Sequence, residues 1–188
     1  MADMSARGRF VWYDLMTTDP QQAEAFYTKT VGWSTEAWQG GPMPYHMWKA
    51  DGKTMGGVME LPANAGAPPH WLAYIAVPDV DATVNDAESR GAKALHRPTD
   101  IPTVGRYAVL SDPQGAVFAV FTSAGNAPGH EGAPTMGEFS WHELATTDID
   151  AAFTFYEALF GWEKKDEDMG PLGIYRIFSR KGIQLGGM

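Results

Sequence analysis

An internal repeat constrains the fold of this chain more than any other feature of its sequence. The run Phe10–Asp19 returns as Phe139–Asp148, a separation of 129 residues. Further matching positions follow at this separation or at one residue more: Phe26-Tyr27 with Phe155-Tyr156, Gly32-Trp33 with Gly161-Trp162, Tyr45 with Tyr175, and Met55-Gly-Gly57 with Leu185-Gly-Gly187. Such a chain is built from copies of one supersecondary unit.

Each copy is predicted to hold one strand, one helix and three further strands. Residues 10–15 alternate as in a strand with both faces covered. This alternation places Phe10, Trp12 and Asp14 on one face and Val11, Tyr13 and Leu15 on the other. A helix follows, with Asp19 as its N-cap and Gly32 as its end. Strands over 33–38, 45–50 and 54–61 complete an α+β unit of the order βαβββ.

A diverged copy with the same order of elements lies between the two similar ones. It reads as a strand over 70–77, a helix from Asp79 or Asp81 to Arg90, and strands over 93–95, 106–111 and 116–121. The turn Asp112-Pro-Gln-Gly115 forms its last hairpin.

The repeat also predicts the domain organisation. Two modules, 7–62 and 69–123, are expected to pair into one domain, followed by a linker over 124–135 that is rich in Gly, Pro and Ala. A third module over 136–188 lacks a partner, and an open sheet edge is usually avoided. Either a fourth module lies outside this chain, or the third module pairs with a second copy in a homodimer.

Charge and composition exclude several functions. The net charge of −9 and the absence of a basic stripe argue against nucleic acid as a partner. No stretch of the chain reaches the ~18 apolar residues of a membrane span. The chain has no Cys, which excludes thiol nucleophiles and thiolate metal sites. We therefore expect a cytoplasmic protein that contacts neither nucleic acid nor membranes.

The order of motifs in this chain resembles that of the vicinal oxygen chelate (glyoxalase/bleomycin resistance protein/dioxygenase) superfamily. The motifs are a strand, an Asp-capped helix with Phe-Tyr, a Gly-Trp pair and an Asp-Pro-x-Gly hairpin. The Phe-x-Trp-x-(Asp/Glu)-Leu opening is similar to tandem-module members labelled glyoxalase-like or hydroxylase. The resemblance implies that paired modules form a cup-shaped mixed sheet with helices outside. It also implies a divalent metal at the base of the cup and lyase, isomerase or dioxygenase chemistry.

The metal positions implied by the resemblance are largely replaced. They fall on Trp12, Leu72 and Ala119, which cannot bind a metal, and on Glu60, which can. One carboxylate does not hold a zinc or iron site. We therefore expect no cofactor. The alternative is a zinc, iron, manganese or nickel ion on shifted ligands, namely Glu60, His70 and His46, or also Asp14.

The cup itself predicts a small-molecule site. Strand alternation brings Trp12, Asp14, His70 and Tyr74 to its inner face, and His46 could reach it from the third strand of the first module. Each of these residues also has a structural interpretation, since aromatic strand residues are often core and His70 follows two prolines at a strand start. The favoured function is binding of an apolar or aromatic small molecule without metal. The alternatives are a metal-dependent enzyme of the glyoxalase type and an interaction protein with a purely structural cup; no catalytic residue is assigned.

Overall fold

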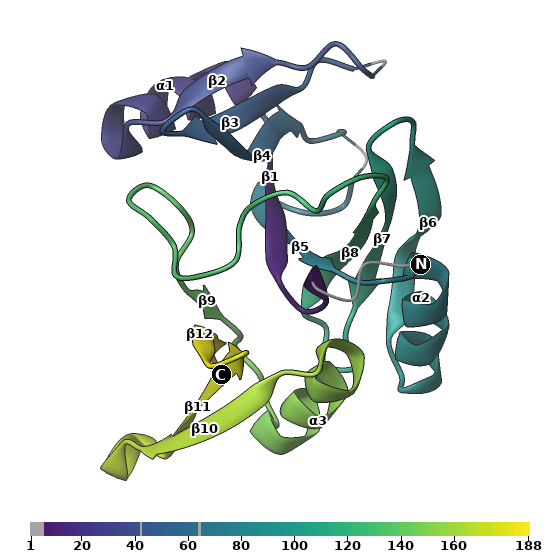
Figure 1. The fold of residues 1–188 in the computed structure, drawn as a ribbon, viewed down its shortest axis with the longest axis vertical. Coiled ribbons are helices and arrows are strands. Elements are labelled where there is room, and N and C mark those ends of the chain that lie inside the picture. Colours follow the sequence, from purple (N-terminus) through teal and green to yellow (C-terminus); the bar gives the residue numbers. More distant parts are fainter. Residues whose placement is uncertain (1–5, 42, 64) are drawn as a thin grey trace.

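The computed structural model describes residues 6–41, 43–63 and 65–188, which form three successive βαβββ modules (Figure 1). The first consists of β1 (Phe10–Thr17), α1 (Pro20–Val31), β2 (Ser34–Ala37), β3 (His46–Ala50) and β4 (Lys53–Glu60). The second consists of β5 (His70–Ala76), α2 (Val80–Ser89), β6 (Lys93–Ile101), β7 (Gly105–Ser111) and β8 (Val117–Ser123). The third consists of β9 (His142–Glu143), α3 (Ile149–Phe160), β10 (Glu163–Asp168), the 3₁₀ turn η2 (Gly170–Leu172), β11 (Ile174–Arg180) and β12 (Ile183–Gly187). The α+β class predicted from the repeat is confirmed.

The first two modules share one sheet of eight strands, in the order β2-β3-β4-β1-β5-β8-β7-β6. Their first strands, β1 and β5, pair antiparallel at the centre, with Trp12 opposite Tyr74 and Asp14 opposite Leu72. Each first strand also pairs in parallel with the last strand of its own module, β4 or β8. The two modules are therefore related by an approximate two-fold axis between β1 and β5.

The third module forms a separate sheet in the order β10-β11-β12-β9. Its first strand, β9, pairs in parallel with β12 as β1 pairs with β4. Among the described residues no strand pairs with the other edge of β9, which is the edge that corresponds to the β5 side of β1.

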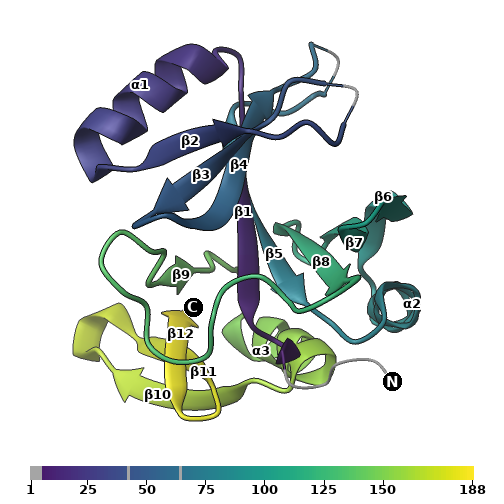
Figure 2. The ribbon, with the colours of Figure 1, turned by 45° about the horizontal axis from the view of Figure 1, so that its top comes forward.

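The helices of the first and third modules have corresponding caps but different surroundings. Asp19 and Asp148 accept hydrogen bonds from backbone N–H groups in the first turn, and Gly32 and Gly161 end the helices in the left-handed conformation. α3 buries Ala152, Phe153, Phe155, Tyr156, Leu159 and Phe160, whereas α1 buries none of its residues. In Figures 1 and 2, α1 lies at the opposite end of the molecule from α2 and α3.

The N-terminal segment before β1 binds the third module. Arg7 donates to the carbonyls of Ala158 and Leu159 at the end of α3, at 2.9–3.1 Å. Trp162 donates its indole N–H to the Gly8 carbonyl at 2.8 Å. A side chain at Gly8 would lie 2.7 Å from the Phe160 carbonyl oxygen, so only glycine fits there.

Two features differ from the sequence-based expectation. A register shift in β1 between Phe10 and Trp12 turns Phe10 to the opposite face. There its ring stacks on that of His142, with 3.6 Å between the ring centroids. The predicted grouping of Phe10 with Trp12 and Asp14 is therefore wrong, because a bulge interrupts strict alternation. β6 extends to Ile101 as an edge strand, whereas the pattern predicted an end at residue 95. Within the described residues, no helix is long and apolar enough to cross a membrane.

Candidate functional site

A buried carboxylate lies at the centre of the cup formed by the first two modules. Asp14 is 6% exposed, and its Oδ1 accepts hydrogen bonds from the Trp12 indole at 2.9 Å and from the Tyr45 hydroxyl at 2.6 Å. Its Oδ2 accepts from the Tyr74 hydroxyl at 2.8 Å. The Trp12 N–H also lies 2.8 Å from the Tyr45 oxygen. Donors from both modules thus converge on one group, which we call the Asp14 cluster (Trp12, Asp14, Tyr45 and Tyr74).

Two adjacent glycines of β4 make room for this cluster. A side chain at Gly57 would lie 2.0 Å from the Tyr45 hydroxyl, so the tyrosine reaches Asp14 by crossing the bare backbone of β4. A side chain at Gly56 would lie 2.1 Å from the Tyr13 carbonyl, in the neighbouring strand. The repeated Gly-Gly pair is therefore required by close packing.

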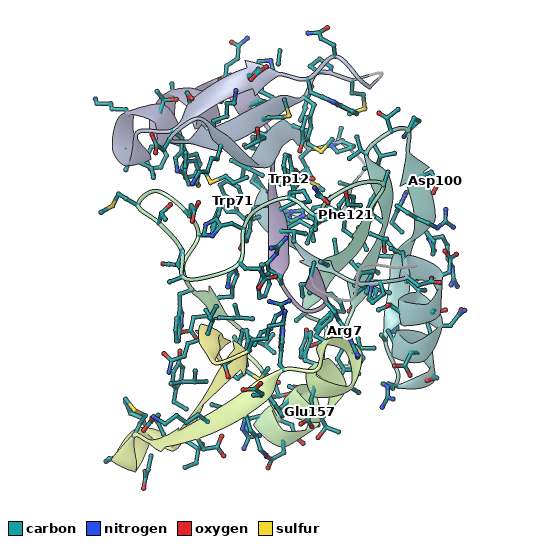
Figure 3. The ribbon with its side chains drawn as sticks, viewed as in Figure 1. Arg7, Trp12, Trp71, Asp100, Phe121 and Glu157 are labelled. Carbon is teal, nitrogen blue, oxygen red and sulfur yellow. The ribbon has the colours of Figure 1, made fainter. Side chains whose placement is uncertain are left out.

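The walls around the Asp14 cluster are apolar and aromatic. Leu72, Ala119 and Phe121 are buried beside Trp12, while Met16 and Tyr107 are partly exposed. The exposed ring of His96 stacks on Tyr107, with ring centroids 5.0 Å apart. Figure 3 shows Trp12 and Phe121 on one side of β1 and Trp71 on the other. A few polar groups within an aromatic wall are typical of a small-molecule site.

Burial dominates the electrostatics of the cluster. It raises the pKa of Asp14, and the hydrogen bonds from Tyr45, Tyr74 and Trp12 counteract that rise. Burial, together with the charge of Asp14, raises the pKa values of Tyr45 and Tyr74. Both tyrosines therefore keep their protons at neutral pH and act as donors to the carboxylate.

The predicted ligand-binding residues are only partly brought together. Trp12, Asp14 and Tyr74 belong to one hydrogen-bonded cluster. His46 lies on the other face of the sheet, where its Nδ1 is 2.6 Å from Glu24 of α1. His70, at the start of β5, bonds to the Pro68 carbonyl at 2.7 Å. A role for any of them in ligand binding stays a prediction.

The donor set does not fit the metal that the superfamily implies. Trp12, Leu72 and Ala119 pack together in the cup, so the positions that should converge on an ion carry no ligand. Glu60 is exposed at the end of β4, and Asp14 is already bonded to tyrosine and tryptophan donors. Within the described residues no three His, Asp or Glu side chains lie close enough to hold a metal ion. The side chains of the cup therefore do not support a reaction step through a metal.

A cavity of about 360 Å³ lies between the first and third modules, on the face of β1 opposite Asp14. Tyr13 and His142 line it and contact each other, with 2.6 Å between the hydroxyl and Nε2. The Nδ1 of His142 lies 2.7 Å from the Leu185 carbonyl, which can only accept, so this nitrogen carries the proton and Nε2 accepts from Tyr13. Burial lowers the pKa of His142. This cavity is distinct from the cup.

Sequence reasoning missed two residues of the cup. Tyr45 belongs to the repeat but was not expected in the site, although its pairing with Gly57, repeated as Tyr175 with Gly187, is a signal for a ring that crosses a bare strand. Tyr107 carries no comparable signal, because it lies in the diverged second module.

The fold and the cup now define the class of protein. The profile of the Glyoxalase/Bleomycin resistance protein/Dioxygenase superfamily matches residues 9–120, which is more than half of the chain, and the chain belongs to this superfamily. In solved structures, a mutant of 4-hydroxymandelate synthase from Streptomyces coelicolor aligns with 97% of this chain and 62% of its own, at 14% identity and a TM-score of 0.61. The Mn(II)-bound glyoxalase of Novosphingobium aromaticivorans aligns with 85% and 54%, at 17% identity and a TM-score of 0.51. These two likenesses concern the fold alone.

Two curated relatives are more similar in sequence. One is "Putative glyoxylase CFP32" of Mycobacterium tuberculosis (strain CDC 1551 / Oshkosh), 43% identical over 118 residues, which are 62% of this chain and 45% of that protein. The other is "Anthracycline biosynthesis protein DauV" of Streptomyces sp. (strain C5), 34% identical over 175 residues, which are 86% of this chain and 63% of that protein. The chain thus spans less than two thirds of the length of these relatives.

Proposed function

We propose that this protein binds a small apolar or aromatic molecule in the cup of its first two modules, without a metal. The observation that carries this proposal is the Asp14 cluster, a buried polar anchor beneath a partly exposed aromatic wall. A ligand with a hydroxyl or N–H group would bond to the remaining lone pair of Asp14 Oδ2, while its apolar body would contact Trp12, Met16 and Tyr107.

A planar aromatic polyketide is the ligand class with the most support. The relative DauV takes its name from anthracycline biosynthesis, and it matches 86% of this chain. Anthracyclines combine fused rings with phenolic hydroxyls. Aromatic rings stack on Trp and Tyr, and hydroxyls donate to a carboxylate.

Titration with an anthracycline, followed through tryptophan fluorescence, tests the proposal. We expect saturable quenching, and an affinity about tenfold weaker after Asp14→Asn or Trp12→Phe, because each change removes a polar or aromatic contact of roughly 1.4 kcal/mol. Tyr156→Phe is the matched control. It removes another buried tyrosine hydroxyl, one that donates to Asp112 at 2.9 Å away from the cup, and the affinity should stay at the wild-type value.

Equal affinities in the wild-type and Asp14→Asn proteins would refute the site. Equilibration with zinc, iron, manganese and nickel, followed by measurement of bound metal, addresses the alternative. One ion held per chain and lost on Glu60→Ala would favour the metal-dependent enzyme of the glyoxalase type instead.

A further inference from the structure

The third module carries a second copy of the carboxylate arrangement. The Trp141 indole donates to Glu143 Oε1 at 2.7 Å, and the Tyr175 hydroxyl donates to the same atom at 2.5 Å. The Trp141 N–H also lies 3.0 Å from the Tyr175 oxygen. These contacts reproduce those among Trp12, Asp14 and Tyr45. Gly187 admits Tyr175 as Gly57 admits Tyr45, since a side chain there would lie 2.0 Å from the hydroxyl.

The arrangement around Glu143 has no counterpart of Tyr74, the donor that the second module supplies to Asp14, among the described residues. Tyr74 of β5 donates to Asp14 Oδ2, but among the described residues no donor contacts Glu143 Oε2. Trp141 is 40% exposed and Glu143 is exposed, whereas Asp14 is 6% exposed. The edge of β9 that corresponds to the β5 side of β1 is likewise unpaired in the described structure.

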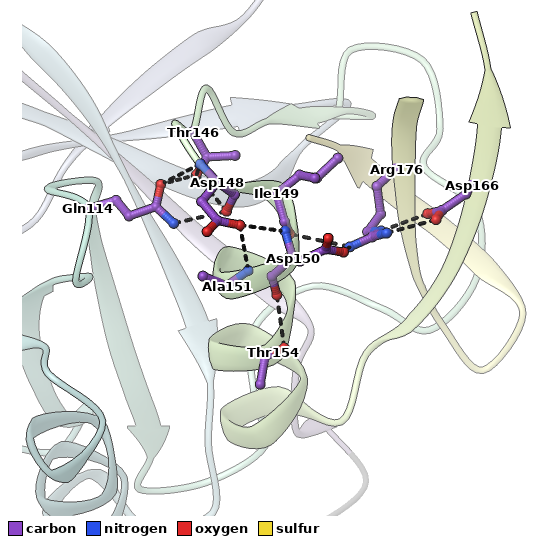
Figure 4. Close-up of polar contacts among 9 residues, drawn as sticks. All are labelled: Gln114, Thr146, Asp148, Ile149, Asp150, Ala151, Thr154, Asp166 and Arg176. Atoms are coloured by element: carbon purple, nitrogen blue, oxygen red, sulfur yellow. Dashed lines mark hydrogen bonds and ion pairs between the residues drawn. The ribbon is translucent and has the colours of Figure 1, made fainter. Parts of the chain in front are cut away.

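The second module also binds the start of α3, and the corresponding residues recur at the start of α1 in the first module. Gln114, in the β7–β8 turn, accepts hydrogen bonds from Thr146 and the Asp148 N–H and donates to the Asp148 carbonyl (Figure 4). It also accepts from the Thr147 N–H and hydroxyl, at 2.9 Å each. Phe155 and Tyr156 of α3 pack on Phe118 of β8.

The same residue types recur at the start of α1 as Thr17-Thr18-Asp19 and Phe26-Tyr27. The burial of the aromatic residue differs between the two helices, because Phe26 is 58% exposed where Phe155 is 5% exposed. The first module therefore keeps the residues of a docking face for a hairpin and strand of the second-module type.

We propose that Trp141, Glu143 and Tyr175 form half of a second ligand site, which is completed when another βαβββ module of the second-module type docks on β9 and α1. Its first strand would pair antiparallel with β9 and bring a hydroxyl donor to Glu143 Oε2. Its last hairpin would bond to Thr17, Thr18 and Asp19 and cover Phe26. The ligand class of this second site rests on the proposed function of the first.

A second copy of this chain does not fit this surface. The two-fold relation of β1 and β5 sets the Asp14 and Tyr74 positions against each other. In a symmetric pair of β9 strands, Glu143 of one copy would therefore occupy the place of Tyr74 and meet Glu143 of the other. Two carboxylates at hydrogen-bond distance repel each other unless one is protonated. The second module of another copy is already bound to its own α3.

The test uses the full chain extended after Met188 by a second copy of residues 59–123, because Met188 corresponds to Val58 in the repeat. Peptide-resolved hydrogen exchange is compared with that of the unextended chain. We expect exchange in β9 and α1 to slow by about tenfold or more. A matched extension, with Tyr74→Phe and Gln114→Ala made only in the appended copy, should lose most of this protection.

Unchanged exchange at β9 and α1 in a folded extension, checked by circular dichroism, would overturn the docking. If the extension does not fold, sedimentation of the unextended chain at pH 7 tests the proposal instead. A dimer with protected β9 amides would show that a second copy of the chain docks on β9, and this would overturn the proposal. Titration with an anthracycline separates the two sites. Two equivalents bound by the extended chain support the second site. A single equivalent, whose affinity is weakened by Asp14→Asn as in the unextended chain, overturns the second site. No binding at all overturns the proposed function and leaves the docking result unaffected.

Discussion

At the scale of single residues, the internal repeat supplies matched controls for the candidate site. The hydroxyls of Tyr45 and Tyr175 make corresponding bonds, one to a buried carboxylate and the other to an exposed one. A buried acceptor left without its donor costs about 1–3 kcal/mol, whereas an exposed one is resolvated. A comparison of changes at Tyr45 and Tyr175 therefore separates the effect of burial from the effect of losing the hydrogen bond itself.

We expect Tyr45→Phe to lower the free energy of unfolding by about 1–3 kcal/mol and Tyr175→Phe by less than about 1 kcal/mol. Urea denaturation followed by circular dichroism measures both. Equal losses would show that the Asp14 cluster is as hydrated as its counterpart in the third module.

The two glycines of β4 should respond differently to alanine. At Gly56 the new methyl group would meet the Tyr13 carbonyl, which belongs to the sheet and cannot move, while at Gly57 it would meet the movable ring of Tyr45. Gly56→Ala should thus cost about 3 kcal/mol or more, and Gly57→Ala about 1–2 kcal/mol. Thermal unfolding gives the ranking, and only Gly57→Ala is expected to weaken anthracycline binding without a large loss of stability. The reverse ranking would contradict the packing described for β4.

The sequence predicted part of the Asp14 cluster and not the rest. Trp12, Asp14 and Tyr74 follow from strand alternation, and the structure places them together. His46 was expected near the cup, but its strand presents Tyr45 to the cup and His46 to α1. Which of the two side chains faces the cup depends on the register between β3 and β4. A single sequence does not define that register.

At the scale of elements, short-range signals predicted the helices well. Asp19 and Gly32 are caps that act locally, and both lie where they were expected. Their counterparts in the repeat, Asp148 and Gly161, cap α3 in the same way. The bulge in β1 and the length of β6 were missed because they depend on neighbouring strands rather than on local propensity. The docking of α3 was missed for the same reason.

The hairpin of the second module holds the start of α3 through Gln114. Gln114→Ala removes the acceptor of Thr147 and Asp148 and the donor to the Asp148 carbonyl, in a partly exposed setting. We expect a loss of about 1 kcal/mol in stability and faster exchange in the first turn of α3. Gln21→Ala, at an exposed position of α1, is the control and should stay within about 0.5 kcal/mol of the wild type. Equal effects of the two changes would show that Gln114 does not hold the helix.

At the scale of the whole molecule, the contact between the first and third modules should respond to pH. Burial lowers the pKa of His142, which accepts from Tyr13 and stacks on Phe10. The unfolded chain then binds more protons than the folded one below about pH 6.5, so stability is present above that pH and is lost as the pH falls.

We expect the free energy of unfolding of the wild type, minus that of His142→Gln, to decrease from pH 7.5 to pH 5.5. The difference cancels the effect of other groups, such as His130, whose pKa is raised by Glu138. Urea titrations at the two pH values give the slopes. A slope in His142→Gln equal to that of the wild type would assign the pH response to another group.

The segment before β1 links the order of synthesis to the order of assembly. Arg7 and Gly8 leave the ribosome well before their partners Ala158, Leu159 and Trp162, which are made about 150 residues later. The eight-stranded sheet can therefore form during translation while this segment has none of these partners. Only once α3 and Trp162 have left the ribosome can the segment bind them, so these contacts become possible only after the whole eight-stranded sheet has been synthesised.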